Sequence, residues 1–423
     1  MRRTARCKGW IAAATLLAAV GLAACGPPTP PAPALGWHPT VLPIDPGGDE
    51  TILTATSTTW WANVRADGAT SGPATLQLHA RSGPYGIAST TPTQEVTLGQ
   101  YAADLAMSEH LLVVRVRDVA DTTDEYRIFE LDPATSTWAY ATSVSLPVEP
   151  FASVQVDVSD DTLVIGRPFT FGGGPDGDVR VVPLDRTGPG VTWWPAAVQV
   201  FTPDPAWSLD ERAKYGHDLA VEGGTVAYGA GERVIVLART GTTWAVDTEL
   251  TDAAGPGTGF ARSIAVDESG GTARVLVGVQ GRFDLGVPRP GQAQLFRRGA
   301  TGWTLAHTFA ADPTGALGGF GFGADVAMDG SRYAFTVRWM QARPTAGGVI
   351  DDYQIELREL QGGAETMVAR SLLELAGGVD AGWGNVGPFA IDLAGTHLAV
   401  SGYAQPSGGS SRFFTVSYDR RPA

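Results

Sequence analysis

The stretch YGHDLAVEGGTVAYGA, residues Tyr215–Ala230, decides the fold. It opens on an aromatic residue and a glycine, continues with two apolar residues separated by one, and reaches a short apolar run after a polar turn. Alternation of apolar and polar residues on both sides of a turn is typical of a β-hairpin. The pattern recurs with 45 to 65 residues between the first apolar members. The apolar pairs are Leu105/Met107, Val156/Val158, Leu219/Val221, Ile264/Val266, Val326/Met328 and Ile391/Leu393.

A weaker seventh copy begins at Thr51, and most copies continue into a second hairpin that carries a tryptophan, such as Trp138 or Trp244. Two hairpins per repeat make four strands, and four-stranded units repeating at such a period indicate the blades of a propeller. We therefore predict an all-β fold over residues 37–423, a seven-bladed β-propeller of four-stranded antiparallel blades. The last copy, from Phe389, has room for three strands, so we expect Val41–Ile44 to supply the fourth and close the ring.

Composition limits the function classes. Glycine at 54 and proline at 29 of the 423 residues argue against long helices, and 43% hydrophobic residues are enough for a core. The net charge of −14 argues against a nucleic-acid partner. Among the six histidines we find no zinc-ligand spacing, and the chain lacks the nucleophile-elbow and phosphate-loop motifs.

The first residues, MRRTARCKGWIAAATLLAAVGLAAC, join a basic head to an apolar run that is too short to span a membrane. The end of this segment, Leu22-Ala23-Ala24-Cys25, resembles the lipobox of bacterial lipoproteins. The resemblance implies a signal peptide over residues 1–24 and a lipid on Cys25. A proline-rich tether over residues 25–36 would follow, with a reach of roughly 25–30 Å.

Export and anchoring follow from that resemblance. Loss of residues 1–24 would remove four basic residues and no acid, leaving a net charge of −18. Anionic headgroups repel such a body, so the lipid would hold the protein at the membrane. Cys7 would leave with the signal peptide, so the mature chain would have no disulfide. We expect the outer membrane if the source is Gram-negative, and otherwise the outer face of the cell membrane.

The repeat resembles the FG-GAP repeat of integrin-α-type propellers and their bacterial relatives. Tyr215-Gly216 and Phe322-Gly323 match its first element, Ser263–Val266 matches its strand, and Tyr228–Ala230 and Ile165–Pro168 partly match its Gly-Ala-Pro. The resemblance implies a seven-bladed propeller with a binding or adhesive role.

Some propellers of this kind bind calcium in a D-x-D-x-D-G loop, which this chain lacks. The nearest stretches, Asp176-Gly177-Asp178 and Asp267–Gly270, offer too few carboxylates for six to eight oxygen ligands. We expect no cofactor and no metal site, with calcium as the alternative.

Three aspartates, Asp104, Asp218 and Asp325, occupy one repeat position, where we expect them to accept backbone N–H groups at a strand entry. His217 precedes Asp218, but neighbours on a strand point to opposite faces, so we predict no relay between them. No catalytic residue is predicted.

Binding usually lies in the longer connections. The candidates are 169–178 with Asp176 and Asp178, 203–214 with Trp207, 281–290, and 339–348 with Trp339. The two tryptophans are either exposed anchors or packed under their own loops.

We therefore predict a monomeric, lipid-anchored, exported propeller that is not an enzyme and acts as a binding or adhesion scaffold for an envelope protein or glycan. One alternative is an exported hydrolase, sialidase-like or otherwise glycan-active, with its site in the central channel. Gly241-Thr242-Thr243-Trp244 resembles part of a sialidase Asp-box but lacks its Ser and Asp. A structural envelope component without a discrete ligand is the other alternative.

Overall fold

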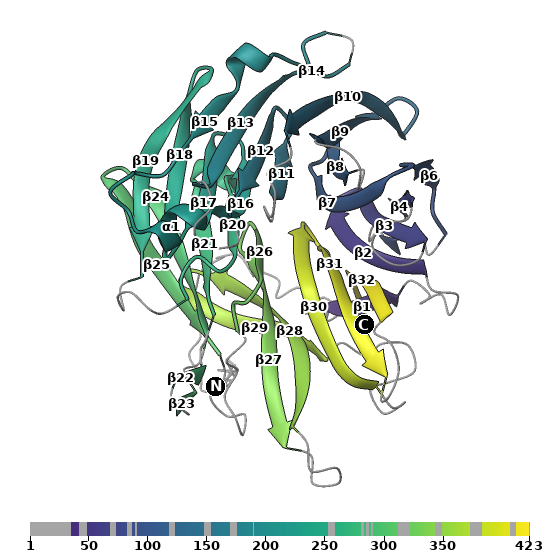
Figure 1. The fold of residues 1–423 in the computed structure, drawn as a ribbon. Coiled ribbons are helices and arrows are strands. Elements are labelled where there is room, and N and C mark those ends of the chain that lie inside the picture. The colour runs from purple at the N-terminus through teal and green to yellow at the C-terminus, as the bar shows by residue number, and fades with distance from the viewer. Residues whose placement is uncertain are drawn as a thin grey trace, which may run out of the picture.

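The computed structural model shows a ring of β-sheets (Figure 1). The structure describes residues 35–41, 49–67, 73–82, 87–88, 91–117, 123–147, 154–169, 176–188, 190–252, 259–280, 283–284, 287–288, 291–311, 322–342, 349–372, 383–406 and 412–422.

Seven antiparallel sheets form the blades, numbered here from the N-terminus, and the prediction of seven four-stranded blades is confirmed. Blade 1 contains β2 (Asp49–Thr56), β3 (Trp60–Asp67), β4 (Ala74–Ser82) and β6 (Gln94–Thr97), with β5 (Ile87–Ala88) beside β4. Blade 2 contains β7 (Tyr101–Met107), β8 (Leu111–Arg117), β9 (Thr123–Asp132) and β10 (Thr137–Pro147). Blade 3 contains β11 (Gln155–Ser159), β12 (Thr162–Arg167), β13 (Asp178–Asp185) and β15 (Gln199–Phe201), with β14 (Thr192–Trp193) beside β13.

The remaining blades follow the same order, with the first strand innermost. Blade 4 contains β16 (Tyr215–Glu222), β17 (Thr225–Ala230), β18 (Arg233–Thr240) and β19 (Thr243–Thr251). Blade 5 contains β20 (Ile264–Asp267), β21 (Arg274–Val279), β24 (Gln292–Gly299) and β25 (Gly302–Ala310). Blade 6 contains β26 (Val326–Asp329), β27 (Arg332–Ala342), β28 (Val349–Gln361) and β29 (Ala364–Leu372). Blade 7 contains β30 (Trp383–Ala394), β31 (His397–Pro406), β32 (Arg412–Pro422) and β1 (Leu35–Val41).

Outside the blades the described residues form a small hairpin, β22 (Phe283–Asp284) with β23 (Val287–Pro288), and three short helices. The helices are η1 (Pro195–Ala197), η2 (Ser269–Gly271) and α1 (Leu209–Ala213). Ser208 caps α1 in a capping box with Glu211, which explains how so short a helix is held.

The N-terminal strand closes the ring. Strand β1 pairs antiparallel with β32, from Leu35 opposite Pro422 to Val41 opposite Val416. The expectation that an N-terminal segment completes the last blade is confirmed, but the strand lies earlier than predicted. Of the expected segment only Val41 belongs to it, and residues 42–44 lie outside the described residues. The first two residues of β1 also fall within the segment predicted as the tether.

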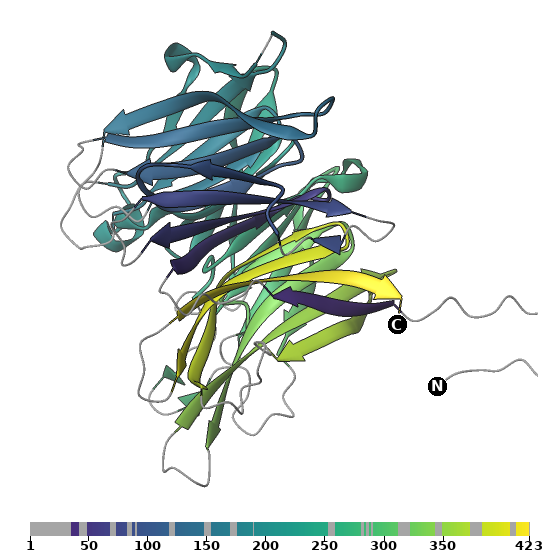
Figure 2. The same ribbon diagram turned by 90° about the vertical axis from the view of Figure 1, so that its right-hand side faces the viewer.

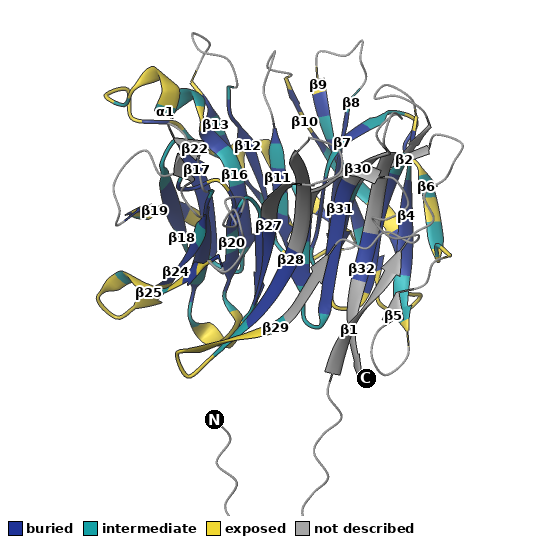
Figure 3. Cartoon of the chain, turned by 90° about the horizontal axis from the view of Figure 1, so that it is seen from below, coloured by how far each residue is buried: buried dark blue, intermediate teal, exposed yellow. Residues whose placement is uncertain are grey.

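The ring has two different faces, seen from the side in Figure 3. One, the tight-turn face, carries the turns that join the first strand to the second and the third to the fourth. The other, the loop face, carries α1 and the connections between blades. Because Leu35 pairs with the last residue of β32, strand β1 starts at the tight-turn face. Figure 2 shows this outer strand beside β32 at the edge of the molecule.

Apolar side chains fill the spaces between blades. The cluster between blades 1 and 2 packs Trp60 edge-on against Trp138, with ring centroids 6.1 Å apart, around Leu76, Val114 and Leu112. Equivalent clusters follow between the next blades. Each sheet is apolar on both faces, so it can be buried only against its neighbours, as expected for a stacked repeat.

Glycines let the blades meet closely at the loop-face end of two joints. A Cβ on Gly166 of β12 would lie 2.3 Å from the carbonyl oxygen of Gly216 in the next blade, and one on Gly278 would lie 2.2 Å from that of Gly323. Gly216 and Gly323 have φ of 81° and 73°, which favours glycine. The aromatic-Gly element of one repeat thus packs against the glycine that ends the second strand of the previous repeat.

Candidate functional site

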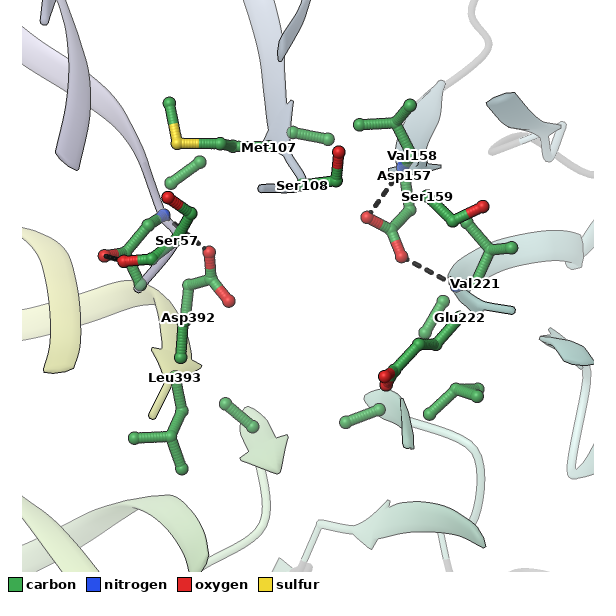
Figure 4. Close-up of a pocket in the computed structure, with 18 of the residues that line it drawn as sticks. Ser57, Met107, Ser108, Asp157, Val158, Ser159, Val221, Glu222, Asp392 and Leu393 are labelled. Atoms are coloured by element: carbon green, nitrogen blue, oxygen red, sulfur yellow. Dashed lines mark hydrogen bonds between the residues drawn. The ribbon is translucent and has the colours of Figure 1, made fainter. Parts of the chain in front are cut away.

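The inner strands of all seven blades surround a cavity of about 610 Å³ on the ring axis (Figure 4). Its lining reaches from the middle of the inner strands to the tight turns, so it opens on the tight-turn face. Ten of the lining residues are acidic, and among the described residues no Lys, Arg or His lines it. The acidic residues are Asp104, Glu109, Asp157, Asp160, Asp161, Asp218, Glu222, Asp325, Asp329 and Asp392.

Three of these aspartates stand directly before the first apolar residue of their inner strands, and each bridges two blades. The Asp104 carboxylate accepts N–H groups from Leu105 (2.9 Å) and from Val156 in the next blade (2.8 Å). Asp325 does the same with its own neighbour and with Ile391 of blade 7 (2.7 Å). Asp218 accepts the N–H groups of the residue after it and of Ile264. The expectation that this repeat position binds backbone N–H groups is confirmed.

Two further aspartates also bridge two blades, and each lies two residues after the repeat position that Asp104 occupies. Asp157 accepts N–H groups from Val158 (2.8 Å) and from Val221 in blade 4 (2.7 Å). Asp392 accepts one from Thr56 in blade 1 at 2.7 Å, which ties the last blade to the first. These two were missed in the sequence because they do not share the aligned position, although each stands between the two members of an apolar pair.

The remaining two joints are bridged at the tight turns. Glu109 accepts the N–H of Thr58 at 2.7 Å and so joins blades 1 and 2. Asp267 accepts the N–H of Gly330 at 2.9 Å and joins blades 5 and 6. Every joint of the ring therefore has a carboxylate of one blade bound to a backbone N–H of another.

Burial raises the pKa of these inner carboxyls. It brings the pKa of Asp157 to about 7 and that of Asp104 to about 6, against the opposing effect of the N–H groups they accept. Burial likewise raises the pKa of Asp325 to about 7 and of Asp392 to about 6. For Asp218, burial and then the charge of Asp325 raise the pKa well above the ordinary value.

Glu222 differs from the five aspartates. It lies at the end of β16, beside the opening of the cavity, and is drawn in Figure 4 with its side chain directed toward the space between the blades. Burial raises its pKa to about 7, and the charges of Asp267, Asp329 and Glu268 add to the shift, while the N–H of Glu268 opposes it. Nothing in the repeat pattern singled out this residue.

Positive charge lies behind the wall of the cavity. The positive charge of Arg115 lowers the pKa of Asp104, and that of Arg81 lowers the pKa of Asp392. The charge of Arg262 lowers the pKa of Asp218 and of Asp325. Within the described part of the chain, no three His, Cys, Asp or Glu side chains come close enough together to hold a metal ion. The carboxyls are thus spread around a ring and do not converge on a point.

The predicted loop residues lie elsewhere, on the loop face. Asp176 pairs with Arg212 at 3.3 Å, and Asp178 pairs with Arg180 at 3.2 Å. The backbone N–H of Gly177 bonds to the carbonyl of Arg212 at 3.0 Å, so the structure brings two of the predicted loops together.

Trp207 packs under its own loop. The half-buried ring lies 4.5 Å from the Arg233 guanidinium and 6.0 Å from the Tyr215 ring, which favours the packed alternative over the exposed anchor. Trp339 belongs to β27, and its side chain lies outside the described residues. Cys25, the signal segment and the tether up to residue 34 also lie outside them.

His217 does not contact the Asp218 carboxylate. Its ring nitrogens bond to the carbonyls of Lys214 (2.8 Å) and Ala261 (2.6 Å), and burial lowers its pKa. The prediction that these neighbours form no relay is confirmed by this arrangement. A Cβ on Gly229 would lie 2.3 Å from the His217 ring, so the imidazole packs directly against this glycine of the adjacent strand.

The exposed large apolar side chains of the described residues are Trp194, which precedes η1, Leu209 of α1, and one on the outer strand of each of five blades. Tyr140, Val200, Val246, Leu305 and Met367 each lie on the outer strand of a different blade. We take the cavity as the candidate site because it is concave and carries the acidic lining described above. No helix among the described residues is long and apolar enough to cross a membrane.

Comparison with known proteins gives matches of low similarity, all of them to solved structures. No protein-family model matches the chain, and no curated protein matches it. Among solved structures it is similar to a periplasmic gluconolactonase of Pseudomonas aeruginosa, with 14% identity and a TM-score of 0.48 over 88% of this chain and 99% of that one. It is also similar to Sqt1 of Chaetomium thermophilum, with 14% identity and a TM-score of 0.46 over 90% of this chain and 98% of that one.

The propeller domain of the Trilobed protease of Pyrococcus furiosus, which has an open velcro topology, gives 10% identity and a TM-score of 0.43 over 87% and 95% of the chains. At such identities the likeness shows the fold alone. It nevertheless corrects one prediction. The sequence was interpreted as that of a non-enzyme; a gluconolactonase among the similar structures contradicts this interpretation, and the likeness assigns no activity to this chain.

Proposed function

We propose that this chain is an exported propeller, held at a membrane by a lipid on Cys25, that binds a small organic cation in its central cavity. The observation that carries the binding part is the charge of the lining, which combines ten acidic residues with no basic one among the described residues. A cavity of about 610 Å³ is within the range of small-molecule sites. A negative wall of low dielectric raises the local concentration of cations.

The distribution of the carboxyls favours an extended cation over a metal ion. Calcium needs six to eight oxygens within about 2.6 Å, whereas the carboxyls here come from separate blades and do not converge. A flexible polyamine can place its ammonium groups near several carboxyls at once. Ser57, Ser108 and Thr58 at the opening add hydroxyl groups to the lining.

Anchoring is supported by the sequence of residues 1–25 and by the place where the described chain starts. Strand β1 begins at the tight-turn face, where the cavity opens. Nine residues lie between Cys25 and Leu35, and a proline-rich segment of that length reaches about 30 Å. In this arrangement the opening of the cavity lies on the side of the tether and the loop face on the opposite side.

Calorimetric titration of the full chain in mild detergent with spermidine tests the binding. We expect saturable binding at pH 8 that weakens about tenfold from low to moderate salt, because the attraction is electrostatic. Calcium and a neutral polyol of similar size serve as comparison ligands and are expected to bind weakly or not at all. Equal heats for spermidine and the polyol would contradict a cation site.

A matched pair of variants locates the site. The double variant Glu222→Gln and Asp329→Asn removes two charges at the opening of the cavity and is expected to lower spermidine affinity about tenfold. Asp210→Asn removes an exposed carboxylate from α1 on the loop face and is expected to leave the affinity unchanged. Equal losses in both would place the cation elsewhere on the surface.

Fractionation tests the anchor. We expect the full chain in the membrane fraction and Cys25→Ala in the soluble exported fraction or retained with its signal peptide. Intact-mass measurement of the first should show the mass of the acyl groups on Cys25. A membrane-bound Cys25→Ala chain without its signal peptide would show that another element provides the attachment.

One observation favours the alternative of a hydrolase in the channel. Asp157, Asp325 and Glu222 come from three blades, line one cavity and have pKa values of about 7, which suits general acid–base chemistry. A panel of lactone and glycoside substrates tests it, with Glu222→Gln as the variant expected to abolish turnover. The same turnover in the variant would exclude Glu222 from the reaction.

A further inference from the structure

The joint between blades 7 and 1 differs in character from the joints between the other described blades. The five joints from blade 1 to blade 6 each hold a cluster of 11 to 17 buried apolar side chains. Between blades 7 and 1 the described residues contribute only Trp61 and Ala399 to such a cluster. The other buried side chains of this joint are polar, and we call it the polar seam: Thr54, Asn63, Gln77 and His79 of blade 1, with Ser401 and Ser417 of blade 7.

Strand alternation explains why polar residues gather here. Asn63 follows Trp61 by two residues and so shares its face of blade 1, and His79 lies opposite Trp61 in the next strand. On the facing side, Ser417 lies opposite Ala399 in blade 7. Large polar side chains of blade 1 therefore meet small side chains of blade 7.

Hydrogen bonds inside blade 1 hold the polar side chains of the seam. The Trp61 indole N–H donates to the Thr54 hydroxyl at 2.8 Å, and Asn63 Nδ2 lies 2.9 Å from His79 Nε2. These bonds do not cross the joint, so they survive if the blades part. The Oδ1 atom of Asn63 is buried and has no partner among the described residues, so water that entered the seam would satisfy it.

The tight turns make the same distinction between the joints. Glu268 of blade 5 accepts the N–H of Gly224 in the turn of blade 4 at 3.0 Å. Equivalent side-chain bonds reach a turn at the joints of blades 1 and 2, 2 and 3, 3 and 4, 5 and 6, and 6 and 7. Between the described turns of blades 7 and 1, residues 394–396 and 57–59, there is no such bond.

The two kinds of joint cost different amounts of free energy to separate. Apolar faces lose about 25 cal/mol for each Å² that water reaches, and nothing compensates for this loss. Polar groups exchange a hydrogen bond within the protein for one to water, at a net cost of about 1 kcal/mol each. The polar seam therefore opens at a lower cost than the five apolar joints.

We propose that the ring opens at the polar seam, so that blades 7 and 1 part while the apolar joints stay closed. The strands that part are β2 and β30, whose residues 54–58 and 391–394 line the cavity. Opening therefore widens the cavity sideways between Thr56 and Asp392. The seam gives the cavity one movable wall, and this holds whatever the cavity binds.

Hydrogen exchange at matched amides of the unmodified full chain, in mild detergent, tests the seam. Thr56 donates its N–H to Asp392 across the seam, and Val221 donates to Asp157 across an apolar joint, both at 2.7 Å. Because donor, acceptor and length match, a difference in protection reports the joint. We expect the Thr56 amide to exchange at least about tenfold faster than that of Val221 after correction for intrinsic rates. Equal or greater protection at Thr56 would overturn the proposal.

The neighbouring amide distinguishes an opening joint from a fraying strand end. The N–H of Ser57 donates to the carbonyl of Trp60 at 2.9 Å, and this bond lies within blade 1. Opening of the seam leaves the bond intact, so we expect Ser57 to keep its protection while Thr56 loses it. Equally fast exchange at both amides would mean that the end of β2 frays and that the seam does not open.

A disulfide across the seam provides a second test. The Cβ position of Gly395 lies 4.0 Å from the Cβ of Thr58, within the range of about 3.5–4.5 Å that a disulfide needs. Thr58→Cys with Gly395→Cys, in a chain that also carries Cys7→Ser and Cys25→Ser, leaves this pair as the only cysteines. We expect oxidation to slow exchange of the amide of residue 56 about tenfold, and reduction to restore it.

A matched disulfide at an apolar joint is the control. The Cβ position of Gly223 lies 3.8 Å from the Cβ of Glu268, and Gly223 and Gly395 have similar positive φ of 55° and 59°. We expect Gly223→Cys with Glu268→Cys, in the same background, to leave exchange at Thr56 unchanged on oxidation. A seam disulfide without effect, or equal slowing by the control, would overturn the proposal. If either variant does not fold, the amides of the unmodified chain still decide.

Discussion

The channel and the loop face both carry many carboxylates, but they handle the charge differently. On the loop face several acids have a cation in contact: Asp176 pairs with Arg212, and Glu211 pairs with Arg233 at 2.7 Å. In the channel the carboxyls bind backbone N–H groups, and no basic residue of the described chain lines the cavity. The loop face is thus neutralised within the protein, whereas the channel retains charge that protons or a cation can neutralise.

The largest expected loss of stability comes from filling the space between two blades with a side chain. Gly166→Val would place a side chain against the carbonyl of Gly216, because even a Cβ would lie 2.3 Å from that oxygen. We expect a loss of about 3 kcal/mol or more in the free energy of unfolding, measured by denaturant titration. Gly188→Ala is the control, since nothing lies within 4 Å of its Cβ position. Similar losses in both would show that blade contact at the joint is not the cause.

The next largest effect is expected from adding a positive charge to the lining of the cavity. Ala394 lines the cavity and is half-buried, so Ala394→Arg introduces a base where the described lining has none. We expect spermidine affinity to fall about tenfold, or about 1.4 kcal/mol at 25 °C. Unchanged affinity would separate cation binding from the charge of the channel.

A smaller loss of stability is expected from removing a positive charge on the loop face. Arg233→Ala removes the partner of Glu211 and of Glu249 (2.6 Å) and uncovers the ring of Trp207. The pairs are partly exposed, so we expect a loss of about 1 kcal/mol in unfolding free energy, in part from lost packing. Spermidine affinity should not change. A tenfold gain in affinity would mean that the loop face also takes up cations.

The smallest effect is expected from an exposed pair. Asp210→Asn breaks the contact with Lys214 at 2.7 Å, in which both side chains are more than half exposed. We expect a change below about 0.5 kcal/mol in unfolding free energy by denaturant titration. A larger loss would indicate that the short helix α1 depends on this pair as well as on its capping box.

The sequence was sufficient for the architecture because each repeat carries its own hairpin pattern. The six apolar pairs together with the weaker copy from Thr51 correctly predicted seven blades. The shared position of Asp104, Asp218 and Asp325 correctly predicted carboxyls that bind backbone N–H groups. The incomplete last repeat correctly predicted an N-terminal closing strand, although the strand begins at Leu35.

The site was harder to predict because its partners are distant in sequence. Asp157 binds an N–H 64 residues away and Asp392 one 336 residues away, and nothing local marks a residue that acts across a joint. The loop residues were singled out for chain length and aromatic character, but these features do not reveal that Arg212 and Arg233 cover them. Exposure and charge compensation are properties of the assembled ring.

The pairing of β1 with β32 has a consequence for how the protein is made. The seventh sheet pairs the first strand of the described chain with β32, so it cannot assemble until β32 has left the ribosome. Six blades can begin to form during synthesis, but the first segment must wait for its partner across nearly four hundred intervening residues. A chain that is cut short before β32 therefore leaves unpaired sheet edges, which chaperones and proteases can recognise.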